Sequence, residues 1–170
     1  MELRLKSSII REWRRKDADD ILVHANDKEV WRNLTDRFPF PYTKRDALDW
    51  IDFNLNSRPP MNFAIEIEGL AVGGIGIGIR DDVRRRSAEI GYWLGRKYWG
   101  QGIITEALQA FTDYAFKNFD LCRLEASVFE WNPASMRVLE KAGYEKEARL
   151  KKAATKDGQT IDLVIYAKVL

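Results

Sequence analysis

The spacing of apolar side chains changes along the chain and predicts a succession of helices and strands. In residues 103–119 apolar positions recur every three or four residues and form one continuous stripe, which predicts an amphipathic helix. Residues 43–55 and 132–142 show the same spacing, with Thr43 and Asn132 at the positions where N-cap residues stand. These three segments are predicted helices.

Shorter apolar runs bounded by turn residues predict the strands. The expected strands are residues 3–13, 62–67, 71–79, 88–94, 122–129, 144–150 and 161–170. Two further helical patterns begin at Asp17, a candidate cap, and at Asp27, whereas the proline-rich segment 38–42 fits neither regular element. The order of elements predicts one mixed α/β layer. Because the chain shows no linker, repeat or low-complexity tract, residues 1–170 are expected to form a single domain.

Glycine and isoleucine alternate in the second half of the expected strand 71–79. With a period of two, the isoleucines occupy one face and the glycines the other. Glycines within a strand indicate that another group packs very closely against that face. A dinucleotide-binding fingerprint does not fit, because no helix follows and the glycine spacing is wrong.

Composition and charge narrow the class of protein. Hydrophobic residues make up 45% of the chain, and 28 basic and 26 acidic residues leave a net charge of +2, so neither a disordered nor a nucleic-acid-binding protein is expected. Arg84–Arg86 is the only tight basic run, which a solvated loop explains better than a phosphate contact. The chain starts without an apolar signal segment and has no apolar run of membrane-spanning length. A cytoplasmic location without membrane partners is therefore expected.

Two residue types that occur once exclude several chemistries. The chain has one histidine, His24, and one cysteine, Cys122. One cysteine rules out an internal disulfide and agrees with a reducing compartment. A zinc site of histidine and cysteine is excluded, so no metal is expected. A Ser-His-Asp arrangement would have to use His24, which falls in an expected surface helix, and it is set aside.

A glycine-bearing turn, residues 96–102, joins a strand to the strongest helix. The first N–H groups of a helix lack partners within it, and the helix dipole makes this end positive, so an anion placed here accepts several hydrogen bonds. Gly100 and Gly102 leave room for a diphosphate, and Arg96 and Lys97 add positive charge. The turn is therefore a candidate phosphate site, with an ordinary strand-to-helix turn as the alternative. The common nucleotide-binding loops do not match its sequence.

These residues lie within longer segments that resemble the motifs of a known family. Residues 88–94 (AEIGYWL) and 98–107 (YWGQGIITEA) resemble the acetyl-CoA motif of the GNAT superfamily of N-acetyltransferases. Residues 123–126 (RLEA) and 132–144 (NPASMRVLEKAGY) follow in the order of that family. The usual ending is matched by Asp157, Gly158, Asp162 and Tyr166. The chain most resembles the RimJ/RimL subgroup, which acetylates protein N-termini, and the likeness covers nearly its whole length.

The resemblance implies a GNAT fold of class α/β (α+β), with a mixed, mostly antiparallel central sheet that is flanked by helices and contains a splayed central pair of strands. It implies acetyl-CoA as cofactor, with the pantetheine arm between the splayed strands and the pyrophosphate on the N–H groups of the turn. The implied cofactor-binding residues are Trp93, Leu94, Gly95, Lys97, Gly100, Gln101, Gly102, Ile103, Ile104, Thr105 and Asn132. The family usually has Gln or Arg in place of Lys97, which puts a contact from this side chain in doubt. Asn132 is a good helix cap whatever the function.

The implied reaction is direct attack of a neutral amine on the acetyl thioester. Deprotonating an α-amine at pH 7 costs about 1 kcal/mol, against about 4.6 kcal/mol for a lysine amine, so an N-terminal amine needs only a modest base. Glu89 is the candidate base, and an ion pair with one of Arg84–Arg86 is the alternative. Ser135 matches the proposed proton donor of the subgroup, although a serine here also suits the helix end. A backbone N–H near Leu94 is implied as the oxyanion donor.

The acceptor site is expected to involve aromatic residues near the proline-rich segment. The candidates are Trp31, Phe38, Phe40 and Tyr42, and the sequence leaves open whether they line a pocket or fill the core. The implied acceptor is the N-terminal α-amine of a protein or peptide. The alternatives are a small amine (a polyamine, an amino acid or an aminoglycoside) and a non-catalytic acyl-CoA-binding module. A homodimer paired through the last strands is common in the family.

Overall fold

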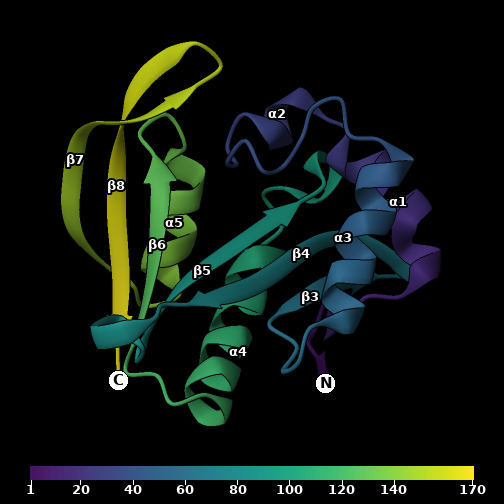
Figure 1. Cartoon of the computed structure of the whole chain (residues 1–170), viewed down its shortest axis with the longest axis horizontal. Helices are drawn as coiled ribbons and strands as arrows, with labels where there is room; N and C mark the ends of the chain where they lie inside the picture. Colours follow the sequence, from purple (N-terminus) through teal and green to yellow (C-terminus); the bar gives the residue numbers. More distant parts are fainter. The chain divides into compact units, whose positions relative to one another are not determined.

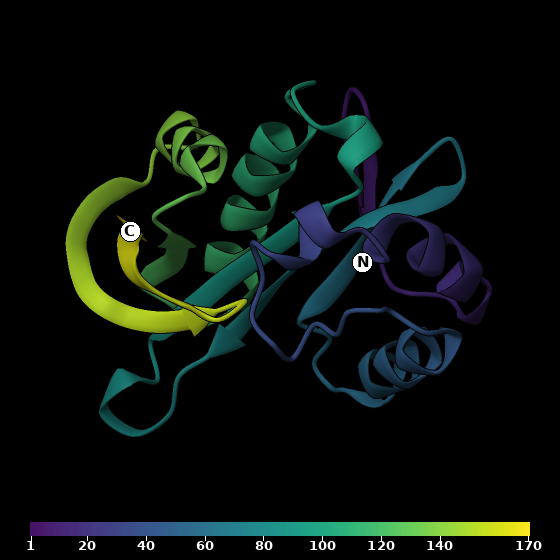
Figure 2. The same ribbon diagram turned by 90° about the horizontal axis from the view of Figure 1, so that it is seen from above.

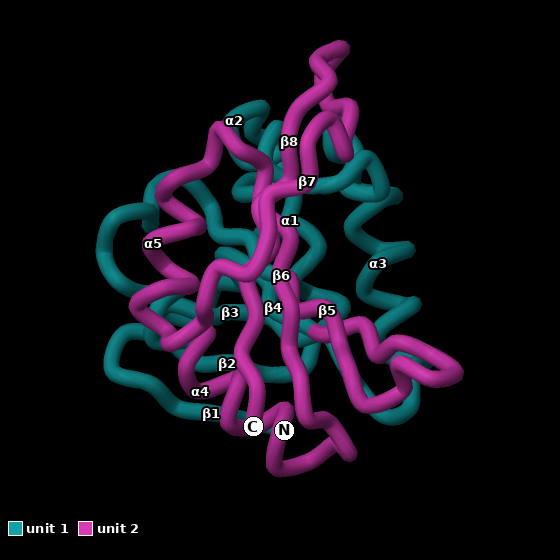
Figure 3. The backbone as a smooth tube through the Cα atoms, turned by 90° about the vertical axis from the view of Figure 1, so that its left-hand side faces the viewer, with its two compact units in different colours: residues 1–76, 92–107 teal, residues 77–91, 108–170 magenta.

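The computed structural model describes residues 1–170, and the chain divides into two compact units (Figure 3). Unit 1 comprises residues 1–76 and 92–107, and unit 2 comprises residues 77–91 and 108–170. Strands β4 (Leu70–Ile79) and β5 (Ser87–Leu94) and helix α4 (Ile103–Asn118) each run from one unit into the other. None of the helices has the length and apolar character needed to cross a membrane.

Eight strands follow the hydrogen-bonded order β1-β2-β3-β4-β5-β6-β8-β7. Strands β5 and β6 pair in parallel. The pairs β1–β2, β2–β3, β3–β4, β6–β8 and β7–β8 are antiparallel. The predicted α/β class with a mixed, mostly antiparallel sheet is therefore confirmed.

Unit 1 opens with two short strands rather than one long one. β1 (Glu2–Arg4) pairs with β2 (Ile9–Arg11) in antiparallel register. The prediction of a single strand over residues 3–13 was wrong because the Leu5 N–H donates to the Ser8 carbonyl at 2.9 Å and reverses the chain there.

The helices α1 (Ala18–Ala25), α2 (Lys28–Trp31) and α3 (Lys44–Asn56) follow in unit 1 (Figure 1). Thr43 caps α3 as predicted: its hydroxyl accepts the Asp46 N–H at 3.2 Å, and the Asp46 carboxylate accepts the Thr43 N–H at 2.7 Å. The buried cluster that joins α1 and α3 to the strands consists of Trp13, Ala18, Ile21, Ala25, Tyr42, Ala47, Ile51, Ala64 and Ala71. Burial of these apolar faces holds the short helices in place.

Asp17 precedes α1 but does not cap it. Its buried carboxylate accepts two hydrogen bonds from the Arg11 guanidinium, at 2.7 and 2.9 Å, and one from the Arg14 N–H at 2.8 Å. Arg11 also pairs with Glu66 of β3 (Asn62–Ile67). Asp17 therefore occupies the predicted N-cap position, but its side chain forms no capping hydrogen bond because a buried arginine binds the carboxylate.

The glycine face of β4 is covered by close side chains. A Cβ atom at Gly74 would lie 2.7 Å from Trp93 Nε1 and 3.2 Å from Trp13 Cζ2. A Cβ atom at Gly76 would lie 2.1 Å from Asn62 Oδ1. The predicted close packing is thus confirmed at these two positions, where only glycine leaves room for the neighbouring side chain.

Unit 2 contains β6 (Arg123–Phe129), α5 (Pro133–Lys141), β7 (Glu145–Lys156) and β8 (Gln159–Val169). β7 continues past the predicted end at residue 150. Register shifts between Lys146 and Ala148 and between Leu150 and Ala154 interrupt its pairing with β8. Such bulges bend a strand, and Figure 2 shows β7 strongly curved.

Candidate active site

The turn between β5 and α4 has the backbone of an anion site. Gly100 and Gly102 adopt φ angles of +74° and +79°, which favour glycine, and no heavy atom lies within 4 Å of a Cβ built on either. The first helical hydrogen bond runs from the Glu106 N–H to the Gly102 carbonyl at 3.1 Å. The N–H groups of residues 103–105 therefore have no partner within the helix. This arrangement fits the pyrophosphate that the sequence predicts here.

Hydrogen bonds within the turn fix its shape. Trp99 Nε1 donates to the Leu94 carbonyl at 2.7 Å, and Gln101 Nε2 donates to the Lys97 carbonyl at 3.1 Å. The Tyr98 N–H donates to the Gly95 carbonyl at 2.9 Å. The side chain of Gln101 is therefore used within the turn, and its contribution to an anion would come from the backbone.

The two cationic side chains of the turn have local partners. Lys97 Nζ lies 5.5 Å from the centre of the Tyr98 ring, and Arg96 pairs with the Asp27 carboxylate at 2.9 Å. Both interactions lie at the surface and are weak. The backbone N–H groups therefore remain the predicted principal anion donors of the turn.

Leu94 and Gly95, at the end of β5, are tightly packed. The Gly95 N–H donates to the Val72 carbonyl at 2.8 Å, so the predicted oxyanion donor near Leu94 is not the N–H of Gly95. Leu94 is buried, and its Cδ1 lies 3.0 Å from a Cβ built on Gly73. A Cβ on Gly95 would lie 2.8 Å from His24 Nδ1. Glycine at position 95 therefore permits the close approach of this imidazole.

The four aromatic candidates form two pairs of different character. Phe38 packs against Tyr42 with ring centres 4.9 Å apart and meets Trp93 edge-on at 5.5 Å. Tyr42 is buried in the core, where burial, with a smaller effect of a nearby carboxylate, raises its pKa to about 12. Trp31 and Phe40 lie 5.7 Å apart, and Phe40 is 41% exposed. Phe38 and Tyr42 thus belong to the packed interior, and Trp31 and Phe40 remain candidates for an acceptor wall.

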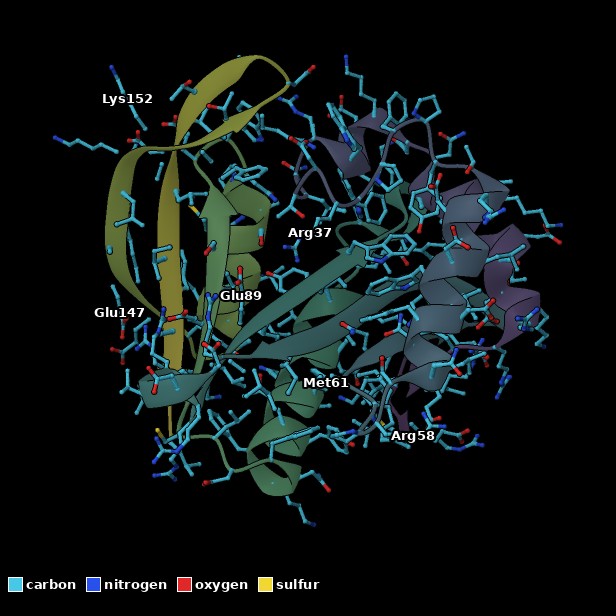
Figure 4. The ribbon with its side chains drawn as sticks, viewed as in Figure 1. Arg37, Arg58, Met61, Glu89, Glu147 and Lys152 are labelled. Atoms are coloured by element: carbon cyan, nitrogen blue, oxygen red, sulfur yellow. The ribbon has the colours of Figure 1, made fainter.

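In unit 2, Glu89 is part of an ion-pair network (Figure 4). One terminal nitrogen of Arg80 donates to Glu89 and to Glu125, each at 3.0 Å. Arg123 also donates to Glu125, at 3.2 Å. Burial raises the pKa of Glu125, but the hydrogen bonds from Arg80 and Arg123 outweigh it, and the net shift is downward. The carboxylate of Glu89 is therefore engaged in an ion pair with Arg80.

The alternative prediction, that Glu89 forms an ion pair with an arginine, is confirmed, but the arginine is not the one predicted. Its arginine is Arg80, not one of the run 84–86. Arg84 pairs with Glu125 at 2.8 Å and Arg86 pairs with Asp120 at 2.9 Å. Two of the three arginines in the basic run are therefore engaged locally, which agrees with a structured surface loop rather than a phosphate contact.

The parallel pairing of β5 with β6 is short. It comprises Ser87↔Arg123, Ala88↔Leu124 and Glu89↔Glu125, and it stops there although both strands continue. Beyond Glu125, β6 pairs with β8 as far as Phe129. The end of this ladder agrees with the predicted splayed strand pair.

Asn132 and Ser135 lie at the start of α5. Asn132 Oδ1 accepts the Ser135 N–H at 3.2 Å, and Pro133 occupies the first helical position. The predicted cap is confirmed. Because the cap uses only the oxygen, the NH₂ group of Asn132 is left for another acceptor.

His24 is the residue that sequence reasoning missed. It lines a pocket of about 400 Å³ together with Val23, Asp27, Arg96 and Lys97. The helical pattern alone placed it on a surface helix, and only the fold brings α1 against the end of β5. No short-range signal in the sequence marks this contact.

The glycine turn, the short parallel ladder and the capped helix α5 occur in the order of a known family. The family model described as "Acetyltransferase (GNAT) domain" matches residues 8–145. An uncharacterised N-acetyltransferase, p20, of Bacillus licheniformis is 32% identical over 167 residues, which cover 93% of this chain and 90% of that protein. The chain belongs to the GNAT acetyltransferase family.

Two further relatives of this GNAT chain point to the expected subgroup. The structure of Mycobacterium smegmatis RimJ in complex with CoA-disulfide has a TM-score of 0.84 and 27% identity, and the match covers 99% of this chain and 86% of that one. The ribosomal-protein-serine acetyltransferase of Escherichia coli K12 is 35% identical over 85 residues, which cover 50% of this chain and 48% of that protein. The GNAT chain is therefore an acetyl-CoA-dependent N-acetyltransferase, as the sequence predicts, with RimJ/RimL-type neighbours.

Proposed function

We propose that this enzyme transfers the acetyl group of acetyl-CoA to the N-terminal α-amine of a protein or peptide, and that residues 1–170 act as a single catalytic domain. The main support for acetyl-CoA as the cofactor is the turn at Gly100 and Gly102. Both glycines have positive φ angles, and the helix that follows begins with three N–H groups that have no helical partners. A protein acceptor is supported by the name of the E. coli relative, a ribosomal-protein-serine acetyltransferase, and the subgroup is supported by the RimJ neighbour.

The roles of individual residues follow from their positions. The backbone from Gly100 to Thr105 would bind the pyrophosphate, and the amide of Asn132 would bind the cofactor arm. Acetyl-CoA, when bound, supplies an activated acetyl group and a thiolate leaving group. Ser135 would give a proton to that thiolate, and Trp31 with Phe40 would form a wall for the acceptor. Glu89 stays a candidate base, although its ion pair with Arg80 counts against it.

The first test measures cofactor binding. Gly100→Ala is expected to weaken CoA binding about tenfold or more, because the positive φ and the open face above the glycine are both lost. Gly158→Ala is the matched control. Gly158 has a φ of +72° and no atom within 4 Å of its Cβ position, but it lies in the turn between β7 and β8. Equal CoA affinity in both variants would show that the turn at Gly100 is misassigned.

The second test identifies the acceptor. Thiol release from acetyl-CoA is measured with a panel of peptides with free N-termini, the same peptides with blocked N-termini, lysine-containing peptides, polyamines and aminoglycosides. Turnover that requires a free peptide N-terminus supports the proposal. Turnover on small amines alone would replace the proposed acceptor class, and CoA binding without turnover on any amine would indicate a binding module.

A further inference from the structure

His24 presents an unengaged imidazole beside the end of β5. The side chain lies over Gly95, where a Cβ atom would be 2.8 Å from Nδ1 and 3.0 Å from Cγ, and it meets the Tyr98 ring edge-on at 5.5 Å. Neither ring nitrogen of His24 forms a hydrogen bond to another protein group. A polar ring packed into the structure without a hydrogen-bond partner is free to bind a ligand.

The pocket beside His24 has the volume of a small binding site, and charged groups surround it. Its volume of about 400 Å³ falls within the range of ligand pockets, which runs from about 300 to 1,000 Å³. The charged groups around the imidazole are Asp20 on its own helix, Asp27 after that helix, and Arg96 and Lys97 from the turn. Asp27 and Arg96 pair with each other at 2.9 Å, so neither dominates the charge of the pocket.

The surroundings of His24 favour the neutral form of its imidazole. Burial lowers the pKa of His24, Asp20 raises it, and Lys97 lowers it further, with a net shift below the usual value of 6.5. A neutral imidazole has a lone pair that can accept a proton.

We propose that His24 accepts the proton of the acceptor amine in this pocket, beside Gly95, one of the residues that the resemblance assigns to the cofactor. This inference rests on the proposed function. The neutral amine R–NH₂ attacks, and its lone pair forms the new N–C bond to the acetyl carbon while the imidazole takes one N–H proton and becomes imidazolium. The C–S bond breaks, its electron pair leaves on the sulfur as thiolate, and the thiolate is protonated through the Ser135 hydroxyl, which regains its proton from solvent as the imidazolium releases its own.

Two observations favour His24 over Glu89 for this role. The Glu89 carboxylate is held by Arg80, whereas the imidazole has no such partner. An imidazole is also matched to an α-amine, whose pKa is near ~7.7, and poorly matched to a lysine amine near ~10.4. His24 as proton acceptor therefore agrees with an N-terminal acceptor.

The test compares pH profiles of kcat/KM for the wild type, His24→Gln and Glu89→Gln with one peptide acceptor. The ratio of wild-type to variant kcat/KM cancels the ionisation of the peptide amine. For His24→Gln we expect a ratio of about 100 at pH 8 that falls towards 1 as the pH drops below the pKa of His24. Asp19→Asn is the control, because Asp19 is an exposed residue of the same helix that pairs with Lys44, and its profile should match the wild type.

A second measurement does not depend on a variant that folds. Because the chain has one histidine, its imidazole Cε1–H resonance in the wild-type protein is assigned directly, and its titration gives the pKa of His24. In the complex with CoA and saturating peptide acceptor, we expect this pKa to lie below 6.5 and to equal the pH at which kcat of the wild type falls to half. A kinetic midpoint that differs from the imidazole pKa would overturn the proposal.

The outcomes separate this inference from the proposed function. An active wild type together with a His24→Gln variant of unchanged profile overturns the role of His24 alone. If instead the fall of kcat/KM at low pH disappears in Glu89→Gln, the proton acceptor is Glu89. A wild type that binds CoA but acetylates no amine overturns both proposals. Thermal stabilisation by CoA should be unchanged in His24→Gln, because the imidazole acts on the acceptor.

Discussion

The indole N–H of Trp99 donates a hydrogen bond of 2.7 Å to the carbonyl oxygen of Leu94. Leu94 is the last residue of β5, and Trp99 immediately precedes the first glycine of the turn. The bond therefore closes the turn from strand to helix across its base. A loop that is ordered by its own side chains loses less conformational entropy when a ligand binds. The proposed phosphate site is thus ordered before any ligand binds.

Trp99→Phe should weaken this pre-organisation. The substitution keeps an aromatic ring, although a smaller one, but removes the indole N–H that donates to Leu94. This is a change of about 1 kcal/mol, so CoA is expected to bind about fivefold more weakly with kcat nearly unchanged. Isothermal titration with CoA measures the difference. Trp50→Phe is the control, because Trp50 lies on α3 and stacks on Phe53. Identical CoA affinity in the two variants would contradict the role given to Trp99.

The sequence predicted the elements whose ends carry local signals. Thr43 and Asn132 mark the starts of α3 and α5, and each accepts the backbone N–H that its position predicts. A cap acts within one turn of helix, so it can be read from neighbouring residues. The positive φ angles of the proposed cofactor turn could be predicted for the same reason, since Gly100 and Gly102 stand within one short segment.

Features that depend on distant residues could not be predicted. The break in the expected strand 3–13 is stabilised by the Lys6 N–H, which donates to Glu106 at 2.9 Å across 100 positions of sequence. The contact of His24 with Gly95 is equally remote. The extension of β7 was missed because its outer residues are polar and show no alternation. Such features follow from tertiary packing, which overrides the local pattern.

Gly74 should be intolerant of any side chain. A methyl group there would lie 2.7 Å from Trp93 Nε1, and the bulky indole cannot move away from the core without cost. Gly74→Ala is therefore expected to lower the free energy of unfolding by about 1–3 kcal/mol. Gly78→Ala, on the same face of β4 with no atom within 4 Å, should change it by less than about 0.5 kcal/mol. Urea denaturation of both variants tests this, and equal stabilities would refute the packing of Trp93 on Gly74.

The buried pair of Arg11 and Asp17 should be essential to unit 1. Asp17→Asn removes a charge that accepts two hydrogen bonds from Arg11, which stays buried with Glu66 as its remaining partner. Breaking a buried pair leaves a poorly compensated charge, so we expect a loss of about 3 kcal/mol in the free energy of unfolding. Asp19→Asn, an exposed acidic neighbour, should lose less than about 0.5 kcal/mol. A similar small loss in both variants would contradict this role.

Two buried tyrosines should make the protein sensitive to high pH. Burial raises the pKa of Tyr42 to about 12, and burial with a hydrogen bond to Glu140 raises that of Tyr166 to about 12. In the unfolded chain the value is near ~10. Because the folded value is higher, the contribution of each neutral phenol to stability is complete below about pH 10 and is lost as the pH rises towards 12.

Tyr42→Phe and Tyr166→Phe should differ in one respect. Between pH 9 and pH 12 the free energy of unfolding of each variant is expected to fall by about 2 kcal/mol less than that of the wild type, because each lacks one phenol that must ionise. Tyr166→Phe also loses the hydrogen bond of 2.8 Å to Glu140 and should be about 1 kcal/mol less stable at pH 8, whereas Tyr42→Phe should be nearly unchanged there. Denaturant unfolding at each pH, with phenolate absorbance as an independent titration, measures both effects. A wild-type pH dependence in Tyr42→Phe would mean that Tyr42 titrates as an exposed residue and that Phe38 and Tyr42 are not packed in the interior.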